Sequence, residues 1–156
     1  MRYVSRVLQP GETVVYATRL HWLIYGRAVV LAIIAVALAI ATSFVADKPN
    51  INLALWIAAA IFALLALSAG LRAFLRRTTT ELAVTDHRVI YKTGLLARHT
   101  LEMNRSKVES VDVDQTIPGR IFGYGTIIVR GTGGSLEPIR QIADPLSFRS
   151  HITVSG

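Results

Sequence analysis

The residues of this 156-residue chain best suited to acid–base chemistry or metal binding are its four histidines. They are scattered along the sequence, at His21, His87, His99 and His151. None forms the HExxH pattern of helical zinc sites, and the absence of cysteine excludes thiolate zinc sites, iron–sulfur clusters and disulfides. We interpret the histidines as solvated or capping groups and expect neither a metal nor a cofactor. His99, near Glu102, remains the best histidine for an enzymatic alternative.

Two carboxylates, Asp112 and Asp114, stand two residues apart in a strand-like segment, so they share one face. Such a pair can hold a hard cation. The simpler interpretation, which we favour, is a solvated strand face opposite the apolar side chains. The glycine-rich run of residues 131–135 lacks the Lys-Ser/Thr ending and the following helix of a phosphate-binding loop, which favours a hairpin turn.

Arg120 is a charged residue among apolar neighbours, between Gly119 and Ile121. An arginine in this position either pairs with a carboxylate inside the domain or faces a membrane. We favour an ion pair, with Asp112 or Asp114 as the partner. If that pair is buried, breaking it costs several kcal/mol.

Two uncharged apolar stretches, Ala28–Ala46 and Pro49–Leu71, dominate the first half of the chain. A helix needs roughly 20 residues to cross about 30 Å of hydrocarbon, and a spanning backbone must satisfy its own hydrogen bonds. The sequence therefore predicts a transmembrane helical hairpin over residues 22–77, with spans at about 24–46 and 50–75. A cleaved signal peptide is disfavoured, because 27 residues precede a core that is too long. Small residues recur four apart, which favours close helix packing or oligomerisation, at Ala28/Ala32, Ala35/Ala39, Ala59/Ala63 and Ala66/Gly70.

The positive charge flanks this hairpin. Of the formal net charge of +7, residues 1–27 carry +3, residues 72–77 carry +3 and residues 78–156 carry only +1. The positive-inside rule then places both termini in the cytoplasm, and a nearly neutral domain argues against nucleic-acid binding. The candidate residues for the membrane interface and lipid headgroups are Arg19, Trp22, Arg27, Arg72, Arg76 and Arg77.

The remaining sequence predicts an antiparallel β domain. A strand is expected over residues 13–20 of the N-terminal cytoplasmic segment 1–21, joining the sheet of a domain at 78–156; an amphipathic helix lying on the membrane is the alternative. Further strands are expected over residues 79–85, 88–93, 95–102, 107–115, 126–130 and 136–142. The parity of Val108 against Val111 predicts a β-bulge near residues 109–110. A helical turn or loop is expected within 116–125. The order Asp144-Pro145 predicts a terminal helix to about residue 153.

This arrangement resembles the bacterial pleckstrin-homology-like membrane proteins, in particular the YdbS-like branch. The matching segments are Leu8-Gln9-Pro10-Gly11-Glu12, His21-Trp22, Leu82 to Ile90, Gly94, Val111 to Thr116 and Gly119 to Thr126. The resemblance implies two sheets packed nearly orthogonally and closed by a C-terminal helix, although the short C-terminal segment implies a reduced cap. The fold class expected is an α+β membrane protein: a two-helix transmembrane hairpin plus a small antiparallel PH-like barrel or sandwich.

Eukaryotic PH domains hold phosphoinositides with basic residues of the first hairpin, where this chain offers only Arg88 and Lys92 around Asp86, so inositol-lipid recognition is not expected. The expected function is a non-catalytic, membrane-anchored binding or scaffold module, multi-pass in the bacterial inner membrane. Its expected partners are the lipid bilayer and either another membrane protein or a second copy. The alternatives are an accessory subunit held through the alanine-rich helices and, more remotely, an enzyme acting on a lipid or small molecule through His99 and Asp112.

Overall fold

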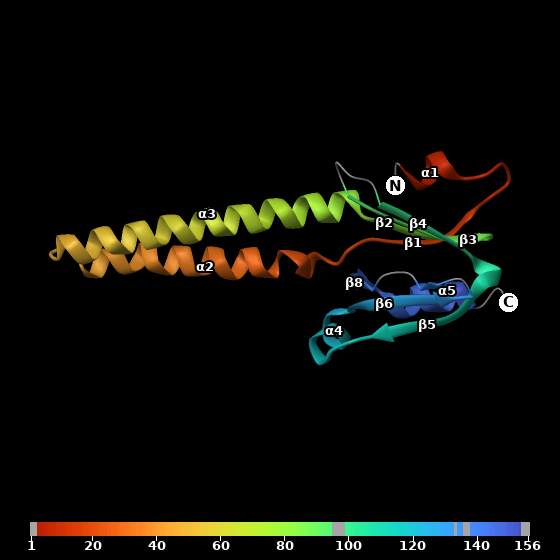
Figure 1. The fold of residues 1–156 in the computed structure, drawn as a ribbon. Helices are drawn as coiled ribbons and strands as arrows, with labels where there is room; N and C mark the ends of the chain where they lie inside the picture. Colours follow the sequence, from red (N-terminus) through yellow and green to blue (C-terminus); the bar gives the residue numbers. More distant parts are fainter. Residues whose placement is uncertain (1–2, 95–98, 133, 136–137, 154–156) are drawn as a thin grey trace. The chain divides into compact units, whose positions relative to one another are not determined.

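The structure is a computed structural model that describes residues 3–94, 99–132, 134–135 and 138–153. The chain divides into two compact units. One, which we call the β unit, comprises Met1–His21 with Arg76–Gly156, and the other, the helical unit, comprises Trp22–Leu75. Figure 1 labels the elements of both units along the chain.

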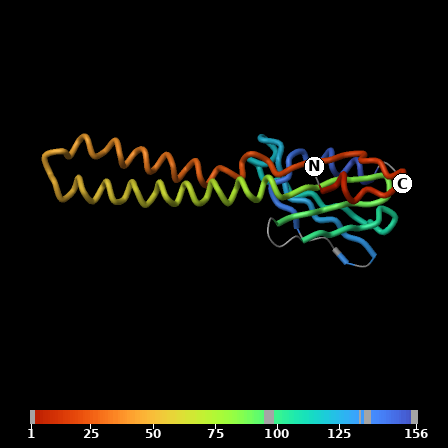
Figure 2. Tube along the Cα trace, turned by 90° about the horizontal axis from the view of Figure 1, so that it is seen from above, coloured from red at the N-terminus to blue at the C-terminus, as the bar shows by residue number. Residues whose placement is uncertain are grey.

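The helical unit is an antiparallel pair of helices. Its first arm runs through η1 (Trp22–Tyr25), α2 (Gly26–Ala41) and η2 (Thr42–Phe44), and its second arm is α3 (Pro49–Thr79), which continues into the β unit. Figures 1 and 2 show the two arms lying side by side. Both arms, Trp22–Phe44 and Pro49–Thr79, are long and apolar enough to cross a membrane, and only 6% and 11% of their most apolar windows are buried. That exposure is unlike a core helix of a water-soluble protein.

Small side chains line the contact between the two arms. Ala35 and Ala59 are among the few buried residues of the helical unit. A Cβ added at Gly70 would lie 3.7 Å from the Cβ of Ala28, an ordinary van der Waals contact. At the turn, the Asn52 side-chain amide donates to the carbonyl oxygen of Thr42 at 2.9 Å. The alanine-rich pattern thus serves packing within the hairpin itself.

The first sheet combines a strand that precedes the helical hairpin in the sequence with strands that follow it. Its strands are β1 (Val14–Thr18), β2 (Glu81–Thr85), β3 (Arg88–Thr93) and β4 (His99–Asn104), antiparallel in the order β1-β2-β3-β4. The N-terminal segment therefore forms a strand rather than an amphipathic helix over residues 14–18. Part of the strand expected at 95–102 lies outside the described residues, and β4 begins at His99.

The second sheet is built around β6 (Tyr124–Gly131). β5 (Val108–Asp114) pairs on one side, while β7 (Gly134–Ser135) and β8 (Ile139–Ala143) also pair with β6. The register of β5 on β6 shifts between Val108 and Ser110, which confirms the predicted bulge. Gly133 of the expected 131–135 hairpin, and the first two residues of the strand expected at 136–142, lie outside the described residues.

One hydrophobic core joins both sheets to the terminal helix α5 (Pro145–Thr153) (Figure 1). It contains Leu82, Val84 and Val89 of the first sheet, Ile127, Val129, Ile139 and Ile142 of the second, and Phe148 and Ile152 of α5. The predicted terminal helix is confirmed, and the Asp144 carboxylate accepts a hydrogen bond from the Ser147 amide at 3.2 Å. An isolated bridge between Leu20 and Ile142 connects the sheets at one corner. The architecture is a two-sheet antiparallel sandwich with a helical cap.

The outer face of the first sheet is covered by an element that the sequence did not predict. The short helix α1 (Val4–Val7) places Val4 against Ala83 and Ile90, which point away from the main core. The Glu81 carboxylate accepts hydrogen bonds from the amides of Tyr3 and Val4. Residues preceding β1 therefore form part of the folded unit.

Candidate functional site

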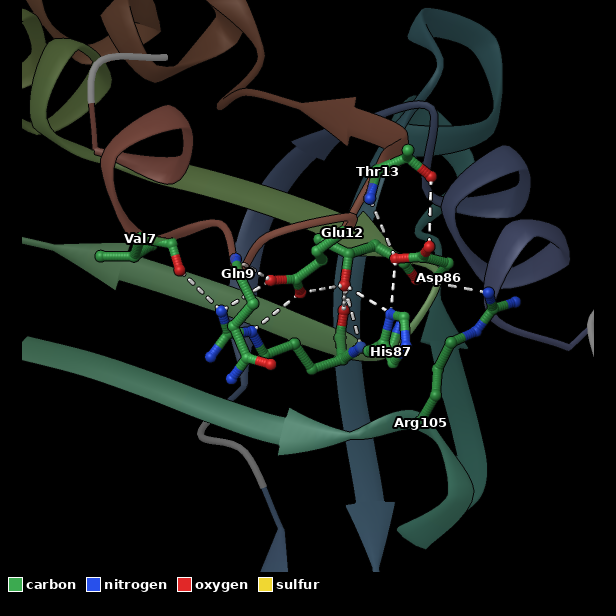
Figure 3. A network of polar contacts seen from close by, with 9 residues as sticks. Val7, Gln9, Glu12, Thr13, Asp86, His87 and Arg105 are labelled. Atoms are coloured by element: carbon green, nitrogen blue, oxygen red, sulfur yellow. Dashed lines mark hydrogen bonds and ion pairs between the residues drawn. The ribbon is translucent and has the colours of Figure 1, made fainter.

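The most buried charged group in the β unit is the carboxylate of Glu12, at the centre of the polar network in Figure 3. Its side chain is 2% exposed, against 17% for its partner Arg88. Arg88 donates through Nε (2.9 Å) and Nη2 (2.8 Å), the Thr85 hydroxyl donates at 2.7 Å and the Gln9 amide at 2.8 Å. Burial alone would raise the pKa of Glu12, but these hydrogen bonds, that of Arg88 foremost, outweigh it and lower the pKa to about 2.

Arg88 makes two further contacts in this network. Arg88 also donates to the Val7 carbonyl oxygen (2.7 Å) and to the Glu102 carboxylate (2.7 Å). No buried side-chain nitrogen or oxygen of the described residues lacks a hydrogen-bond partner. A cluster of this kind fixes the N-terminal segment on the β2–β3 hairpin.

The β2–β3 hairpin, where eukaryotic PH domains hold phosphoinositides, is likewise occupied by internal contacts. Arg88 is held by Glu12, and the ammonium of Lys92 lies 5.8 Å from the ring centroid of Tyr3. The turn residue Asp86 accepts from the Thr13 amide at 3.1 Å and contacts His87 Nδ1 at 2.8 Å. The His87 hydrogen bond is the main reason that the pKa of Asp86 is lowered. Figure 3 shows this turn beside the Glu12 cluster.

Arg105 fastens the end of α5. Its Nη2 donates to the carbonyl oxygens of His151 and Ile152, in the last turn of the helix, and its Nη1 donates to the Thr85 carbonyl oxygen at 3.3 Å. A guanidinium placed on the last carbonyls complements the helix dipole. Tyr16 packs on the same helix, stacked on His151 at 4.4 Å between ring centroids.

An open groove of about 750 Å³, which we call the β5–α5 groove, lies beside these contacts. Five consecutive β5 residues, from Val108 to Asp112, line it. The side chains of a strand alternate between faces, so consecutive residues line a groove only where it runs along the strand's edge. Within the part of the chain that the structure describes, β5 is an edge strand, since only β6 pairs with it. Arg149 and Ile152 of α5 form the opposite wall.

A second hollow of about 300 Å³, which we call the arginine hollow, lies next to the helix α4 (Ile117–Phe122). Its lining residues are Arg76, Asp114, Thr116, Tyr124, Gly125, Thr126, Arg140 and Gln141. Gln141 has a φ of +61°, a strained conformation for a non-glycine residue, and its carbonyl oxygen accepts from the His21 amide at 2.7 Å. No ion pair joins Arg76 or Arg140 to a described carboxylate.

The predicted ion pair of Arg120 with Asp112 or Asp114 is wrong. Asp112 instead accepts from Arg130 Nε at 2.9 Å, in an exposed cross-strand pair, and Arg120 is exposed on α4. The reason is local: the residue of α4 that faces inward is Gly119, so its neighbour Arg120 points elsewhere.

The four histidines do not converge on one site. His21 stacks on Tyr124 at 5.5 Å, and its pKa is lowered by burial first and by nearby Arg77 second. His87 pairs with Asp86, His151 packs on Tyr16, and His99 begins β4. Among the described residues no group of three or more histidine or acidic side chains is placed to hold a metal ion.

The candidate lipid-contacting residues are mostly exposed. Arg19, Trp22, Arg27, Arg72 and Arg76 are exposed and Arg77 is half-buried. Of these, only Arg76 lines one of the two hollows described here. Sequence reasoning missed Arg140, the second arginine of that hollow, because 63 residues of chain separate it from Arg76 and no local pattern marks it.

Comparisons with known proteins give one result. The family model described as the bacterial PH domain matches residues 13–154, nearly the whole chain and both units of the structure. No curated protein and no solved structure matches.

Proposed function

Because the chain belongs to the bacterial PH domain family, we propose that it is a membrane-anchored, non-catalytic binding module. The hairpin of Trp22–Phe44 and Pro49–Thr79 crosses the bacterial inner membrane twice. The β unit stands at the cytoplasmic face and binds an extended segment of another membrane protein, or of a second copy, in the β5–α5 groove.

The observation that carries this proposal is the pairing of β1 with β2. Thr18 precedes the first apolar arm and Leu82 follows the second, yet they are register partners in one sheet. Two strands of one sheet must lie on the same side of a membrane, so the chain between them crosses an even number of times. Exposed apolar arms of spanning length supply two crossings, and the flanking arginines favour the cytoplasmic side.

The hydrogen bonding and the positions of the polar side chains support a binding role over catalysis. Glu12, Thr85 and Arg88 are engaged in one internal hydrogen-bond network, and the histidines are dispersed. PH-like folds present surfaces to partners, although a fold alone does not define a function.

The β5–α5 groove supports an extended partner segment. An edge strand offers unpaired backbone groups that an added strand can pair with, and α5 provides a wall for side chains. Glu109 and Arg149 in the lining give one charge of each sign for selecting a partner.

Site-specific photo-crosslinking in native membranes tests the proposal. A crosslinker at Glu109 or Arg149 is expected to capture a defined protein, while a matched one at the exposed β4 residue Thr100 is not. Equal capture at Glu109, Arg149 and Thr100 contradicts a binding role for the groove. Capture of neither a partner protein nor a second copy at these positions contradicts it as well. Capture mainly through α3, for example at the exposed residue Leu64, favours instead the accessory-subunit alternative.

Topology is tested separately, using the absence of native cysteine. Lys48→Cys is expected to react with an impermeant maleimide in intact cells, whereas Ser106→Cys reacts only after the membrane is opened. Labelling of both positions in intact cells, or of neither, overturns the proposed orientation.

A further inference from the structure

The helix α4 carries an unusual apolar surface. Ile117 is 78% exposed, Ile121 is 73% exposed and Phe122 is 51% exposed. Ile117 and Ile121 are four residues apart, so they lie on one face of the helix. Among the described residues of the β unit, these three form the most exposed cluster of large apolar side chains.

This exposure belongs to a well-fixed element. A Cβ added at Gly119 would lie 2.7 Å from the Tyr124 carbonyl oxygen, so the backbone of α4 packs directly on the start of β6. The Thr116 hydroxyl accepts from the Gly119 amide at 3.2 Å and caps the helix N-terminus. Gly123, with a φ of +72°, ends the helix in the left-handed conformation. α4 is therefore held with its isoleucine face outward.

Within the β unit, α4 lies where the chain leaves for the apolar helices and returns from them. His21, the last residue before the helical unit, stacks on Tyr124 and interacts with the Phe122 backbone. Arg76, the first residue after the helical unit, lines the arginine hollow together with Thr116 and Tyr124. If the apolar helices cross a bilayer, both attachment points lie at its surface, and α4 lies beside them.

The charges beside α4 suit an anionic surface. Arg76 and Arg140 line the hollow against one carboxylate, Asp114, and Arg120 adds a further exposed cation on α4. Thr116 and Thr126 also line it. Guanidinium groups bind phosphate oxygens through charge-assisted hydrogen bonds, and hydroxyls add donors.

We propose that α4 inserts Ile117, Ile121 and Phe122 into the leaflet that the helical hairpin crosses, while Arg76 and Arg140 bind the phosphate of an anionic phospholipid there. This inference rests on the proposed membrane span of the hairpin. Interfacial helices bury their apolar face about 5–10 Å into the headgroup and acyl boundary, and nearby cations strengthen the contact. The β unit would then be held against the leaflet by a second contact, which limits its rotation.

Quenching of a fluorescent label by spin-labelled lipid tests the proposal in the full chain reconstituted in vesicles. The label is attached at Ile121→Cys, with Leu64→Cys on α3 and Ser106→Cys on the far loop as matched references. In vesicles of phosphatidylglycerol and phosphatidylethanolamine, quenching is expected at positions 121 and 64 and not at 106. Quenching at 64 but no more at 121 than at 106 overturns the insertion of α4 and leaves the anchor intact. If the label at position 64 is not quenched either, both the insertion of α4 and the membrane span of the hairpin are overturned.

Three further variants separate the contribution of the apolar side chains from that of the arginines. With the label at Ile117→Cys, Ile121→Asp is expected to abolish quenching without unfolding the chain, because residue 121 is exposed. Arg76→Ala and Arg140→Ala are each expected to lower the ratio of inserted to withdrawn α4 about fivefold, from roughly 1 kcal/mol per arginine near a charged leaflet. Arg130→Ala, at an exposed arginine that lines neither hollow, leaves it unchanged. Equal quenching of the label at Ile121→Cys, with both arginines kept, in vesicles of zwitterionic phosphatidylcholine contradicts the binding of an anionic phospholipid.

Discussion

The guanidinium of Arg88 grips both oxygens of the Glu12 carboxylate, through bonds of 2.9 and 2.8 Å, across 76 residues of sequence. Both apolar helices lie in the chain between these two residues. The pair thus fastens the segment that precedes the hairpin to the sheet that follows it. Because both groups are largely buried, each depends on the other for its solvation.

Removing one partner is expected to destabilise the β unit strongly. Arg88→Ala leaves the buried Glu12 carboxylate without its main donor, and we expect a loss of about 3–5 kcal/mol in unfolding free energy. Urea unfolding of the full chain in mild detergent, followed by hydrogen exchange of β2 and β3 amides, measures it. Arg130→Ala, which breaks the exposed pair with Asp112, is the matched control and should cost less than about 1 kcal/mol. Similar losses in the two variants would contradict the role assigned to burial.

The Glu12 carboxylate also makes the unfolding free energy of the chain depend on pH. The pKa of Glu12 is about 2 in the folded chain, below its ordinary value of 4.5, so the unfolded state binds the proton more tightly. Its contribution is fully present above about pH 4.5 and is lost as the pH falls towards 2. We expect the stability difference between the native chain and Glu12→Gln to shrink across this range. A difference that is constant from pH 6 to pH 2 would show that Glu12 is not ionised in the fold.

Gly119 is expected to tolerate no side chain. A Cβ at this position overlaps the Tyr124 carbonyl oxygen, which belongs to the backbone and cannot move cheaply. We expect Gly119→Ala to cost about 1–3 kcal/mol, measured as the unfolding midpoint of the β unit. Ile121→Ala on the exposed face of the same helix serves as the control and should leave the midpoint nearly unchanged.

Arg105, which caps the C-terminal end of α5, allows a prediction about the stability of that helix. Arg105→Ala removes the donors to the His151 and Ile152 carbonyl oxygens, and we expect a cost of about 1.5–3 kcal/mol. Hydrogen exchange should speed up in the last turn of α5 before it does in β6. Arg149→Ala, an exposed arginine of the same helix, provides the comparison. Uniform acceleration across the β unit would mean that Arg105 acts on global stability and not as a cap.

Local patterns predicted several elements of the fold because their causes are local. The parity conflict between Val108 and Val111 was enough to place the bulge, since a strand cannot bury both on one face without an extra residue. Asp144 followed by Pro145 was enough to place the start of α5. The two apolar arms follow from length and composition alone.

The contacts that sequence reasoning missed depend on register or on long separations. Asp112 is the register partner of Ile128, so Arg130, two residues further, is its diagonal neighbour on the same face. Nothing in the loop between the strands fixes that register in advance, and the sequence favoured Arg120 instead. The Glu12–Arg88 pair and the Arg76–Arg140 hollow join residues that only the folded sandwich brings together. The four-residue α1 is too short to carry a periodic signal.

The position of β1 ahead of the apolar arms imposes an order on biosynthesis. β1 leaves the ribosome before either arm, and its partner β2 emerges only after both have been made. If both arms cross a membrane, as proposed, the first sheet can close only after both have been inserted. A chain in which one arm fails to insert would keep β1 away from β2 and expose the edge of β2 to proteases. In a chain whose arms cross a membrane, as proposed, completion of this sheet would therefore mark the insertion of both arms.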